Sequence, residues 1–515
     1  MKGKFYITSA IPYVNGVPHL GHTLEFVISD VIARYHRLYG DNTLITCGSD
    51  ENGQKILEAG KKENLKPQVL ADKNTKAFLK HIKNLNVHFD EWRRGTDKKL
   101  HWPGVEKLWN LCKKNGDIYK KKYKGLYCVG CESFYTKNEL TEGKCLEHLK
   151  KPEEIEEENY FFKLSKYQKK LEELIESDEL KVFPKIRKNE TLGFIKQGLK
   201  DFSISRPVER LKGWGVPVPD DDSQIMYVWF DALTIYMTSV GWNYDEKLWK
   251  KWWPVDVHII GKGIYRFHTV YWPAMLLSAG LSLPKSVLVH GYITSGGQKM
   301  GKSLGNVIDP EEILKKYGTD AVRYYLLKEI PTQSDGDFTD ERFKEVYNGN
   351  LANGLGNLVA RVLTMAERFC DGKIPEIDQD PEKHPLRVGK DLYTWKQAYV
   401  DLNKFVGKYQ FHEALAAIWK FIKTADKYID EKKPWEMVKK KEKKSELNYV
   451  IFGLLDGLHQ LGYQLYPFLP ETSRKIGEAL SIEGLLKKQP LNKDGWTNVK
   501  SGVKIKKIKP LFPRL

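Results

Sequence analysis

Two histidines stand close together near the start of the chain, in the stretch HLGH. His19 and His22 flank Gly21, directly after a predicted strand and turn, where a helix is expected to begin. The N-terminus of a helix favours an anion, and imidazole N–H groups donate to phosphate oxygens. A metal site would need a further ligand, which the neighbouring sequence does not clearly offer. The pattern therefore favours a phosphate site, to which Gly21 would allow close approach.

A second basic cluster, GGQKMGKSLG, places Lys299 and Lys302 in a glycine-rich loop after a predicted strand. Two mobile ammonium groups suit a pyrophosphate group whose charge grows during transfer. Most K-x-x-K pairs are only solvated surface, so this cluster alone is a weak signal.

Four potential metal ligands occur as two tight pairs. Cys128 and Cys131 have C-x-x-C spacing, and Cys145 and His148 have C-x-x-H spacing after a hairpin-like segment. Four such ligands complete the tetrahedral shell of a structural zinc ion and leave no open position for water. The alternative is a redox C-x-x-C motif, which would not need the second pair. The pattern favours one structural Zn²⁺ per subunit.

The elements that must position the two basic clusters follow from hydrophobic periodicity. Residues 5–14 predict a buried strand, residues 22–40 an amphipathic helix, and residues 42–50 a second strand parallel to the first. Further short strands are predicted at 256–263 and 285–294. In such a sheet, ligands bind beyond the carboxyl ends of the strands, which is where HLGH would lie.

The composition narrows the class of partner. Of the 515 residues, 84 are Lys or Arg and 67 are Asp or Glu, which gives a formal net charge of +17. This surplus favours a polyanion, with nucleic acid ahead of a membrane, although a solvated Lys/Glu surface gives the same balance. No apolar run is long enough for a signal peptide or a membrane span, so we expect a cytoplasmic protein with no membrane partner.

The ordered motifs resemble those of a known enzyme class. HLGH resembles the HIGH motif and KMGKS the KMSKS motif of class I aminoacyl-tRNA synthetases, and among these the chain closely resembles the methionyl-tRNA synthetase family. The resemblance runs from residue 4 to about residue 440. It includes the cysteine and histidine pairs together with AIPYVNGVPHLGH, NYFFKLSKYQ, SISRP, YVWFDAL, FHTVYWPAML and VHGYIT.

The resemblance implies a two-step reaction. L-methionine and ATP, the latter with Mg²⁺, form methionyl-adenylate and pyrophosphate, and the methionyl group then moves to the 3′-terminal adenosine of tRNA(Met). Such an enzyme mainly orients the reactants and stabilises phosphate charge. By position, the catalytic and ATP-binding residues would be His19, His22, Lys299 and Lys302, with Gly21 as a further ATP contact.

A methionine pocket and an anticodon site are implied in the same way. Asp50 would pair with the amino-acid ammonium, and the Tyr236 hydroxyl and the Ile11 N–H would lie near the sulfur. The whole pocket would comprise Ile11, Tyr13, Asp50, Trp229, Ala232, Tyr236, Ile264, Phe267, His268 and Trp272. The anticodon readers would be Asn357, Arg361 and Trp435, with the tryptophan stacked on a splayed base. Without the resemblance, these aromatic residues are more often core residues, and the Asn–Arg pair an exposed helix face.

The predicted fold class is α/β: a class I Rossmann-type nucleotide-binding domain, interrupted by a zinc-binding insertion and followed by an α-helical anticodon-binding bundle. We expect these segments: 1–115, the first half of the Rossmann-type domain; 116–224, the connective insertion with the zinc knuckle; 225–295, the second half; 296–345, the KMSKS-like loop and stem-contact region; and 346–515, the anticodon-binding helices with the basic extension KIKKIKPLFPRL, to which we assign no element.

Three positions depart from the family pattern. Asn52 stands where the family usually has histidine, and Gly301 where it has serine; we expect both to be tolerated. Gly263 stands where the family has an acidic residue near the nucleotide ribose, so the carboxylate expected to contact ATP there is missing.

Two other functions stay open. One is a non-catalytic tRNA-binding paralogue, against which the joint presence of both histidines, Asp50 and both lysines speaks. The other is a related synthetase for leucine, isoleucine, valine or cysteine, although the short insertion has no room for a typical large editing domain. The chain ends soon after the predicted bundle, so we expect a monomer.

Overall fold

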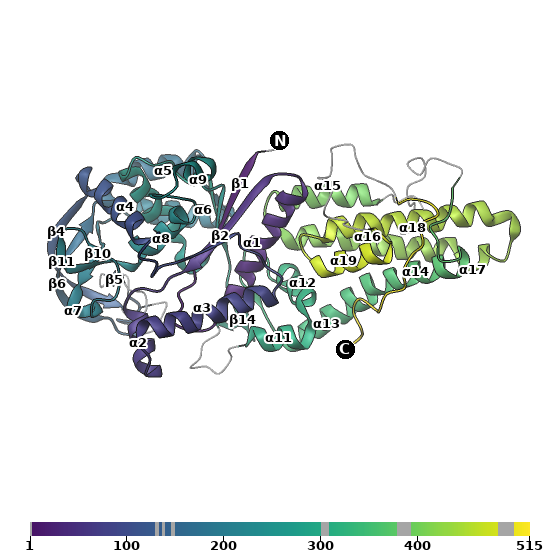
Figure 1. Ribbon diagram of the computed structural model, residues 1–515, viewed down its shortest axis with the longest axis horizontal. Helices are drawn as coiled ribbons and strands as arrows, with labels where there is room; N and C mark the ends of the chain where they lie inside the picture. The colour runs from purple at the N-terminus through teal and green to yellow at the C-terminus, as the bar shows by residue number, and fades with distance from the viewer. Residues whose placement is uncertain are drawn as a thin grey trace.

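The structure is a computed structural model that describes residues 3–128, 133–135, 140–145, 150–299, 308–377, 393–482 and 499–515. The molecule is elongated, with the strands and their covering helices at one end and a group of helices at the other (Figure 1). Among the described residues, no helix has both the length and the hydropathy needed to cross a membrane.

Six parallel strands form the central sheet, in the order β3-β2-β1-β12-β13-β7. In chain order these are β1 (Lys4–Ser9), β2 (Asn42–Ser49), β3 (Glu91–Arg94), β7 (Lys181–Phe183), β12 (Val257–Gly261) and β13 (Ser286–His290). The predicted parallel pair is confirmed, with Lys4 opposite Asn42 and Thr8 opposite Thr46. Because the strand order reverses between β1 and β12, a ligand crevice is expected at the carboxyl ends of these two strands.

Successive residues of β1 point into two different cores, one on each face of the sheet. Ile7 packs in a core that includes residues of α1 and α3, whereas Tyr6 packs in a core that includes residues of α4, α8 and α10. Burial on both faces explains why β12 and β13, which lie inside the sheet, are mainly apolar. The helices around the sheet are α1 (Leu20–Leu38), α2 (Gln54–Glu63), α3 (Pro67–Asn84), α4 (Trp102–Lys114), α5 (Gln168–Glu176), α6 (Lys185–Lys196), α8 (Val228–Thr238), α9 (Glu246–Trp252) and α10 (Trp272–Ser278).

The edge strand β7 lies inside the range 116–224 that the sequence assigned to an insertion. It pairs in parallel with β13, so the chain returns to the central sheet within that range and this part of the assignment was wrong. A run of three residues is too short to show a period. The other described residues of the range include α5, α6, η2 (Leu164–Tyr167) and α7 (Val208–Leu211) and form two small sheets. One contains β4 (Ile118–Cys128), β5 (Ser133–Tyr135), β6 (Glu153–Phe162) and β8 (Phe202–Ser203), and the other contains β9 (Ser205–Pro207), β10 (Pro217–Val218) and β11 (Asp221–Met226).

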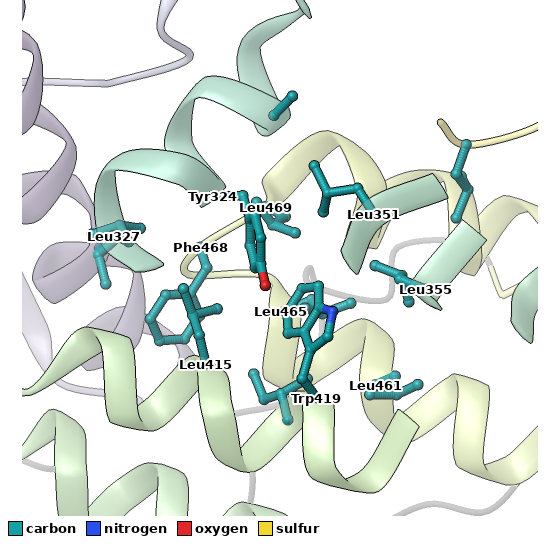
Figure 2. Packing of buried hydrophobic residues seen from close by; sticks show 14 of the residues in the cluster. Tyr324, Leu327, Leu351, Leu355, Leu415, Trp419, Leu461, Leu465, Phe468 and Leu469 are labelled. Carbon is teal, nitrogen blue, oxygen red and sulfur yellow. The ribbon is translucent and has the colours of Figure 1, made fainter. Parts of the chain in front are cut away.

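A third small sheet and three helices follow β13. The elements are β14 (Ile293–Ser295), β15 (Gln298–Lys299), β16 (Gly336–Asp337), α11 (Pro310–Tyr317), α12 (Thr319–Glu329) and α13 (Asp340–Val346). From there on, the elements in the described part of the chain are helices: η6 (Tyr347–Gly356), α14 (Asn357–Phe369), α15 (Trp395–Val406), α16 (Phe411–Lys432), α17 (Pro434–Met437), η8 (Lys441–Lys443), α18 (Lys444–Leu465) and α19 (Pro470–Ala479). Figure 2 shows Trp419 of α16 beside Tyr324 of α12 and Leu465 of α18 in their shared apolar core.

A buried arginine joins the two ends of the molecule. The guanidinium of Arg323, on α12, is fully buried and forms a 2.7 Å ion pair with Asp30 on α1. The same guanidinium donates to the backbone carbonyls of Phe468 at 2.8 Å and Pro467 at 2.9 Å, just before α19. A buried charge with this many partners fixes the position of α12 between the sheet and the C-terminal helices.

Candidate active site

The two N-terminal histidines cap α1 where it begins beside the carboxyl end of β1. The Nδ1 of His19 accepts hydrogen bonds from the backbone N–H groups of Gly21 at 3.1 Å and His22 at 3.4 Å. The Nδ1 of His22 accepts from the backbone N–H of His19 at 3.3 Å, and the two rings stack with centroids 3.7 Å apart. A neutral imidazole that accepts at Nδ1 carries its proton on Nε2. Both rings therefore hold an Nε2–H donor at a helix N-terminus.

Burial keeps His22 neutral. Desolvation lowers the pKa of its imidazole well below the ordinary value, and the neighbouring His19, His81 and His290 lower it further. A Cβ at position 21 would lie 2.9 Å from Cε1 of His19, so glycine is also required for the His19 ring to cap the helix. The sequence suggested only ligand approach as the reason for Gly21.

Buried His81, on α3, connects α1 to α11. Its Nε2 lies 2.9 Å from the hydroxyl of Thr23, and its Nδ1 lies 2.5 Å from a carboxylate oxygen of Glu311 in the first turn of α11. Asn84 donates to the other oxygen of Glu311 at 2.7 Å. No sequence pattern indicates this link, because its members are 58 and 230 residues apart. The link ties the start of α1 to the helix that follows the lysine loop.

The structure places only part of the lysine loop. The backbone of Lys299 pairs with Thr294 in the β14–β15 hairpin, directly beyond β13. Gly301 and Lys302 lie outside the described residues. The chain is described again from Ile308, and the Asp309 side chain then caps α11 by accepting from the N–H of Glu311 at 2.8 Å.

The predicted pocket residues of α8 and of residues 264–272 come together. Trp229 stacks on Phe267 with centroids 3.9 Å apart and planes 8° from parallel. Phe267 and His268 belong to a π-helical turn, η4 (Phe267–Tyr271), which follows η3 (Lys262–Ile264). Such turns are frequent at functional sites. Ile11, Tyr13, Trp229, Ile264 and Phe267 are half-buried, whereas Ala232, Tyr236, His268 and Trp272 are buried.

Two of the predicted pocket residues, Tyr236 and His268, are buried polar groups that contact each other. The Nδ1 of His268 donates to the carbonyl of Ile264 at 3.0 Å, so its Nε2 accepts from the Tyr236 hydroxyl at 2.8 Å. The backbone N–H of Ile11 also interacts with this hydroxyl. The pocket therefore combines aromatic walls with a fixed polar group, which suits a weakly polar side chain.

Asp50 lies opposite Tyr13 beyond the carboxyl ends of the strands, because the pairing of β1 and β2 continues past their last residues. Asp50 and Tyr13 form a parallel bridge, with the N–H of Asp50 donating to the carbonyl of Pro12 at 2.9 Å. Asp50 is 8% exposed. The Tyr13 hydroxyl donates to the carbonyl of Asn52 at 2.6 Å, which fixes the loop after Asp50.

Asn52, one of the departures from the family pattern, is held by residues that the sequence did not single out. Its amide donates to Asp231 at 2.5 Å and to the carbonyl of Gly95 at 3.1 Å. The second oxygen of Asp231 lies 2.6 Å from Nε2 of His101, and all of these side chains are buried. Asp231 lies between Trp229 and Ala232, so a single carboxylate in an otherwise apolar helix was the available signal.

A second departure from the family pattern, Gly263, has a neighbouring side chain where its own would be. A Cβ there would lie 2.3 Å from the Tyr292 hydroxyl. Beside it, the Lys262 ammonium forms a 2.6 Å ion pair with Asp335. A side chain at position 263 would therefore require Tyr292 to move.

His268 gives the pocket a pH-dependent contribution to stability. Burial lowers its pKa to about 4, so the folded protein holds the neutral ring. Unfolded histidine titrates near pH 6.5, so this contribution is present above pH 6.5 and is lost as the pH falls from 6.5 to about 4, by about 3 kcal/mol in total. We expect the melting temperature to fall less over this range in His268→Gln than in the parent, with exposed His88→Gln as the control. A ring NMR titration of His268 near pH 6.5 would contradict this.

Only part of the predicted metal site is described. Cys128 ends β4, and Cys145 follows the turn 141–144; both side chains are buried. Cys131 and His148 lie outside the described residues. Within the part of the chain that the structure covers, no three His, Cys, Asp or Glu side chains are grouped as metal ligands.

The predicted anticodon residues lie on two C-terminal helices. Arg361, on α14, forms ion pairs with Asp426 at 2.9 Å and Asp430 at 2.6 Å, both on α16. Asn357, four residues earlier, is exposed, and Trp435 in α17 is 40% exposed. A tryptophan this exposed contributes little to a core and is available for stacking.

The parallel sheet, together with the paired histidines beyond β1 where the strand order reverses, defines a class I aminoacyl-tRNA synthetase. A family model described as "tRNA synthetases class I (M)" matches residues 5–151 and 135–363. The methionine–tRNA ligase of Caldanaerobacter subterraneus subsp. tengcongensis is 40% identical over 523 residues, covering 100% of this chain and 79% of the relative. That of Thermotoga maritima is 39% identical, covering 99% and 80%. The crystal structure of Mycobacterium tuberculosis methionyl-tRNA synthetase bound by methionyl-adenylate matches with a TM-score of 0.92 and 34% identity, over 99% of this chain and 100% of that one.

The chain belongs to the methionyl-tRNA synthetase family. Its activity is that of a methionine–tRNA ligase, which activates L-methionine with ATP and transfers it to tRNA(Met). The assignment excludes the non-catalytic paralogue and the synthetases for other amino acids.

Proposed function

We propose that methionine is activated in the crevice at the carboxyl ends of β1 and β12, with residue roles as follows. The Nε2–H groups of His19 and His22 donate to phosphate oxygens of ATP, which enters with Mg²⁺, and Gly21 lies against them. Lys299 and Lys302 bind the β- and γ-phosphates as their charge increases. The observation that carries this proposal is that backbone N–H groups donate to Nδ1 of both rings at the N-terminus of α1, which makes Nε2 the protonated nitrogen of each ring.

The chemistry needs no protein nucleophile. A carboxylate oxygen of methionine attacks the α-phosphorus, the bond to the bridging oxygen breaks, and pyrophosphate leaves. The terminal ribose hydroxyl of the tRNA then attacks the methionyl carbonyl, loses its proton, and AMP leaves. The protein holds the reacting atoms in line and stabilises the phosphate charge.

The half-buried and buried pocket residues would hold the methionine. The Asp50 carboxylate pairs with its ammonium, and Trp229, Phe267 and Ile264 surround its side chain. The sulfur lies near the Tyr236 hydroxyl and the Ile11 N–H, and His268 fixes the orientation of that hydroxyl. Ala232 and Trp272 close the slot, so a β-branched side chain would fit it less well.

We propose that the segment division holds with one amendment: residues 181–183 belong to the Rossmann-type sheet. The C-terminal helices from residue 346 then form the anticodon-binding domain, in which Arg361, Asn357 and Trp435 contact the anticodon. Asp426 and Asp430 orient the Arg361 guanidinium and use two of its five N–H donors, which leaves the others for a base edge.

We propose a structural zinc site in the segment after β4. The two described ligands fit it, because both are buried soft donors and Cys145 contacts Tyr135 of β5, the strand that pairs with the end of β4 at Cys128. Cys131 and His148 complete the predicted set. The ion would hold the two ligand pairs together and would take no part in the reaction.

Replacement of a zinc ligand tests this site. We expect Cys145→Ala to lose the zinc, because three ligands bind far more weakly than a closed set of four. Cys112→Ala, at a buried cysteine in α4, is the control and should keep one zinc per chain. Elemental analysis of the purified variants gives the metal content, and zinc retained in Cys145→Ala would refute the ligand set.

We propose that the protein is a monomer and that it acts in the cytoplasm, where its part in translation would place it. Light scattering at micromolar concentration should give 59.7 kDa, the mass of one chain. Twice this mass would contradict the proposal, and cell fractionation would test the location.

A further inference from the structure

The basic C-terminal segment, residues 504–515, forms no helix or strand but is bound to the C-terminal helices along its length. It carries five cations and no acidic residue. Backbone and side-chain hydrogen bonds hold it at both ends: Ile505 N–H to Gly372 O at 2.9 Å, Lys506 N–H to Ala479 O at 2.7 Å, Arg514 Nε to Asn353 Oδ1 at 2.9 Å and Leu515 N–H to Asn348 Oδ1 at 3.0 Å. Figure 1 shows the chain end passing α14. The segment is therefore a fixed part of the surface.

The segment separates its apolar residues from its lysines. Ile505, Leu511 and Phe512 are buried, and the Phe512 ring packs edge-on against Tyr347 at 6.0 Å between centroids. The side chains of Lys504, Lys506, Lys507 and Lys509 are exposed. Among the described residues, the one carboxylate within 4 Å of these ammonium groups is Glu367, at 3.9 Å from Lys507. A 3.9 Å pair at an exposed surface contributes little, so the lysines are available to an external anion.

The lysines lie along a groove between the segment and α14. The cavity has a volume of about 750 Å³ and is lined by Gly356 at the end of η6 and, three or four residues apart on α14, by Ala360, Thr364 and Glu367. Thr364 follows Asn357 by seven residues and Arg361 by three, so it belongs to their helix face as well as to the groove. The groove therefore lies next to the face proposed to read the anticodon.

We propose that residues 504–515 form a phosphate-binding strip, in which Lys504, Lys506, Lys507 and Lys509 bind the tRNA backbone beside the anticodon bases. This rests on the proposed role of α14. Lysine contacts to phosphate release counterions and are independent of base sequence, so they add affinity and fix the position of the loop while the α14 face reads the bases.

The test replaces the four lysines with glutamine. We expect this strip variant to bind tRNA(Met) about tenfold more weakly or worse at 0.1 M salt, with the slope of log K against log salt reduced by about 0.7 to 0.9 for each phosphate that is no longer bound. A tRNA with an altered anticodon should lose the same factor, and ATP–pyrophosphate exchange should not change. The matched control replaces Lys169, Lys170, Lys185 and Lys200, four exposed lysines around α5 and α6, and should keep the parent slope.

The outcomes separate this inference from the function on which it rests. An unchanged slope in the strip variant, or an equal loss in the control, overturns the strip. If Trp435→Ala loses discrimination between tRNA(Met) and the tRNA with an altered anticodon while the strip variant binds like the parent, the result supports anticodon reading by the C-terminal helices and refutes the phosphate-binding strip. If the strip variant binds tRNA(Met) more weakly while Trp435→Ala still discriminates between the two tRNAs, the phosphate contacts are supported and the assignment of Trp435 as an anticodon reader is wrong.

Discussion

Replacing His22 with alanine lowers the rate of methionine-dependent ATP–pyrophosphate exchange by about 10²- to 10³-fold, the usual cost of one preorganised donor to a charged transition state. His22 holds its Nε2–H at the N-terminus of α1, and its Nδ1 is occupied by the His19 backbone. Because the donor acts on charge that develops during the reaction, the loss should appear mainly in kcat. Methionine affinity, measured by titration, should stay near the parent value, since the pocket residues are untouched.

The control for this variant must separate catalysis from folding. His22 also packs edge-on against Phe78 at 5.0 Å between centroids, so its removal leaves a small cavity. His88, with a 71% exposed side chain, offers a matched replacement, and His88→Ala should keep full exchange activity. If His22→Ala melts like the parent and still exchanges at more than a tenth of the parent rate, the proposed role of His22 is wrong.

Replacing Trp435 with alanine reduces kcat/KM for the aminoacylation of tRNA(Met) by about 5- to 150-fold, since stacking of a base on an aromatic ring contributes about 1–3 kcal/mol. Trp435 is 40% exposed, so its removal should cost little stability. Pyrophosphate exchange takes place without tRNA and should not change. Steady-state kinetics with both assays on one preparation measures the two effects.

A second tryptophan gives the contrast. Trp395 is only half-buried, at the start of α15, and Trp395→Ala should leave tRNA kinetics within about twofold of the parent. Equal losses in the two variants would mean that Trp435 acts through general folding of the helices. An unchanged kcat/KM in Trp435→Ala would remove it from the anticodon site.

The features that the sequence predicted are local and periodic. The unit from Lys4 to Ser49 was found because two apolar strands flank a long amphipathic helix, and its parallel register follows from that order. Asp50 and the residues around Trp229 and His268 were found through the family resemblance; the structure pairs Asp50 with Tyr13 and brings Trp229 into contact with His268.

The features that the sequence missed depend on contacts between distant residues. The link from Thr23 through His81 to Glu311 and the Asn52–Asp231–His101 network join residues 43 to 230 apart, and no local period marks them. Strand β7 was not predicted because three residues are too few to show the alternation of a strand. The basic C-terminal segment could not be assigned because its conformation is set by the helices that it crosses rather than by its own propensity.

Whether this crevice activates methionine with ATP is tested most directly by pyrophosphate exchange without tRNA, with leucine, isoleucine, valine and cysteine assayed in parallel. We predict that methionine alone supports exchange. Such exchange would also show that the enzyme binds ATP with glycine at position 263. Exchange with another amino acid at a comparable rate would contradict the pocket assignment. No exchange with any of them, while tRNA(Met) still binds, would contradict activation in this crevice altogether.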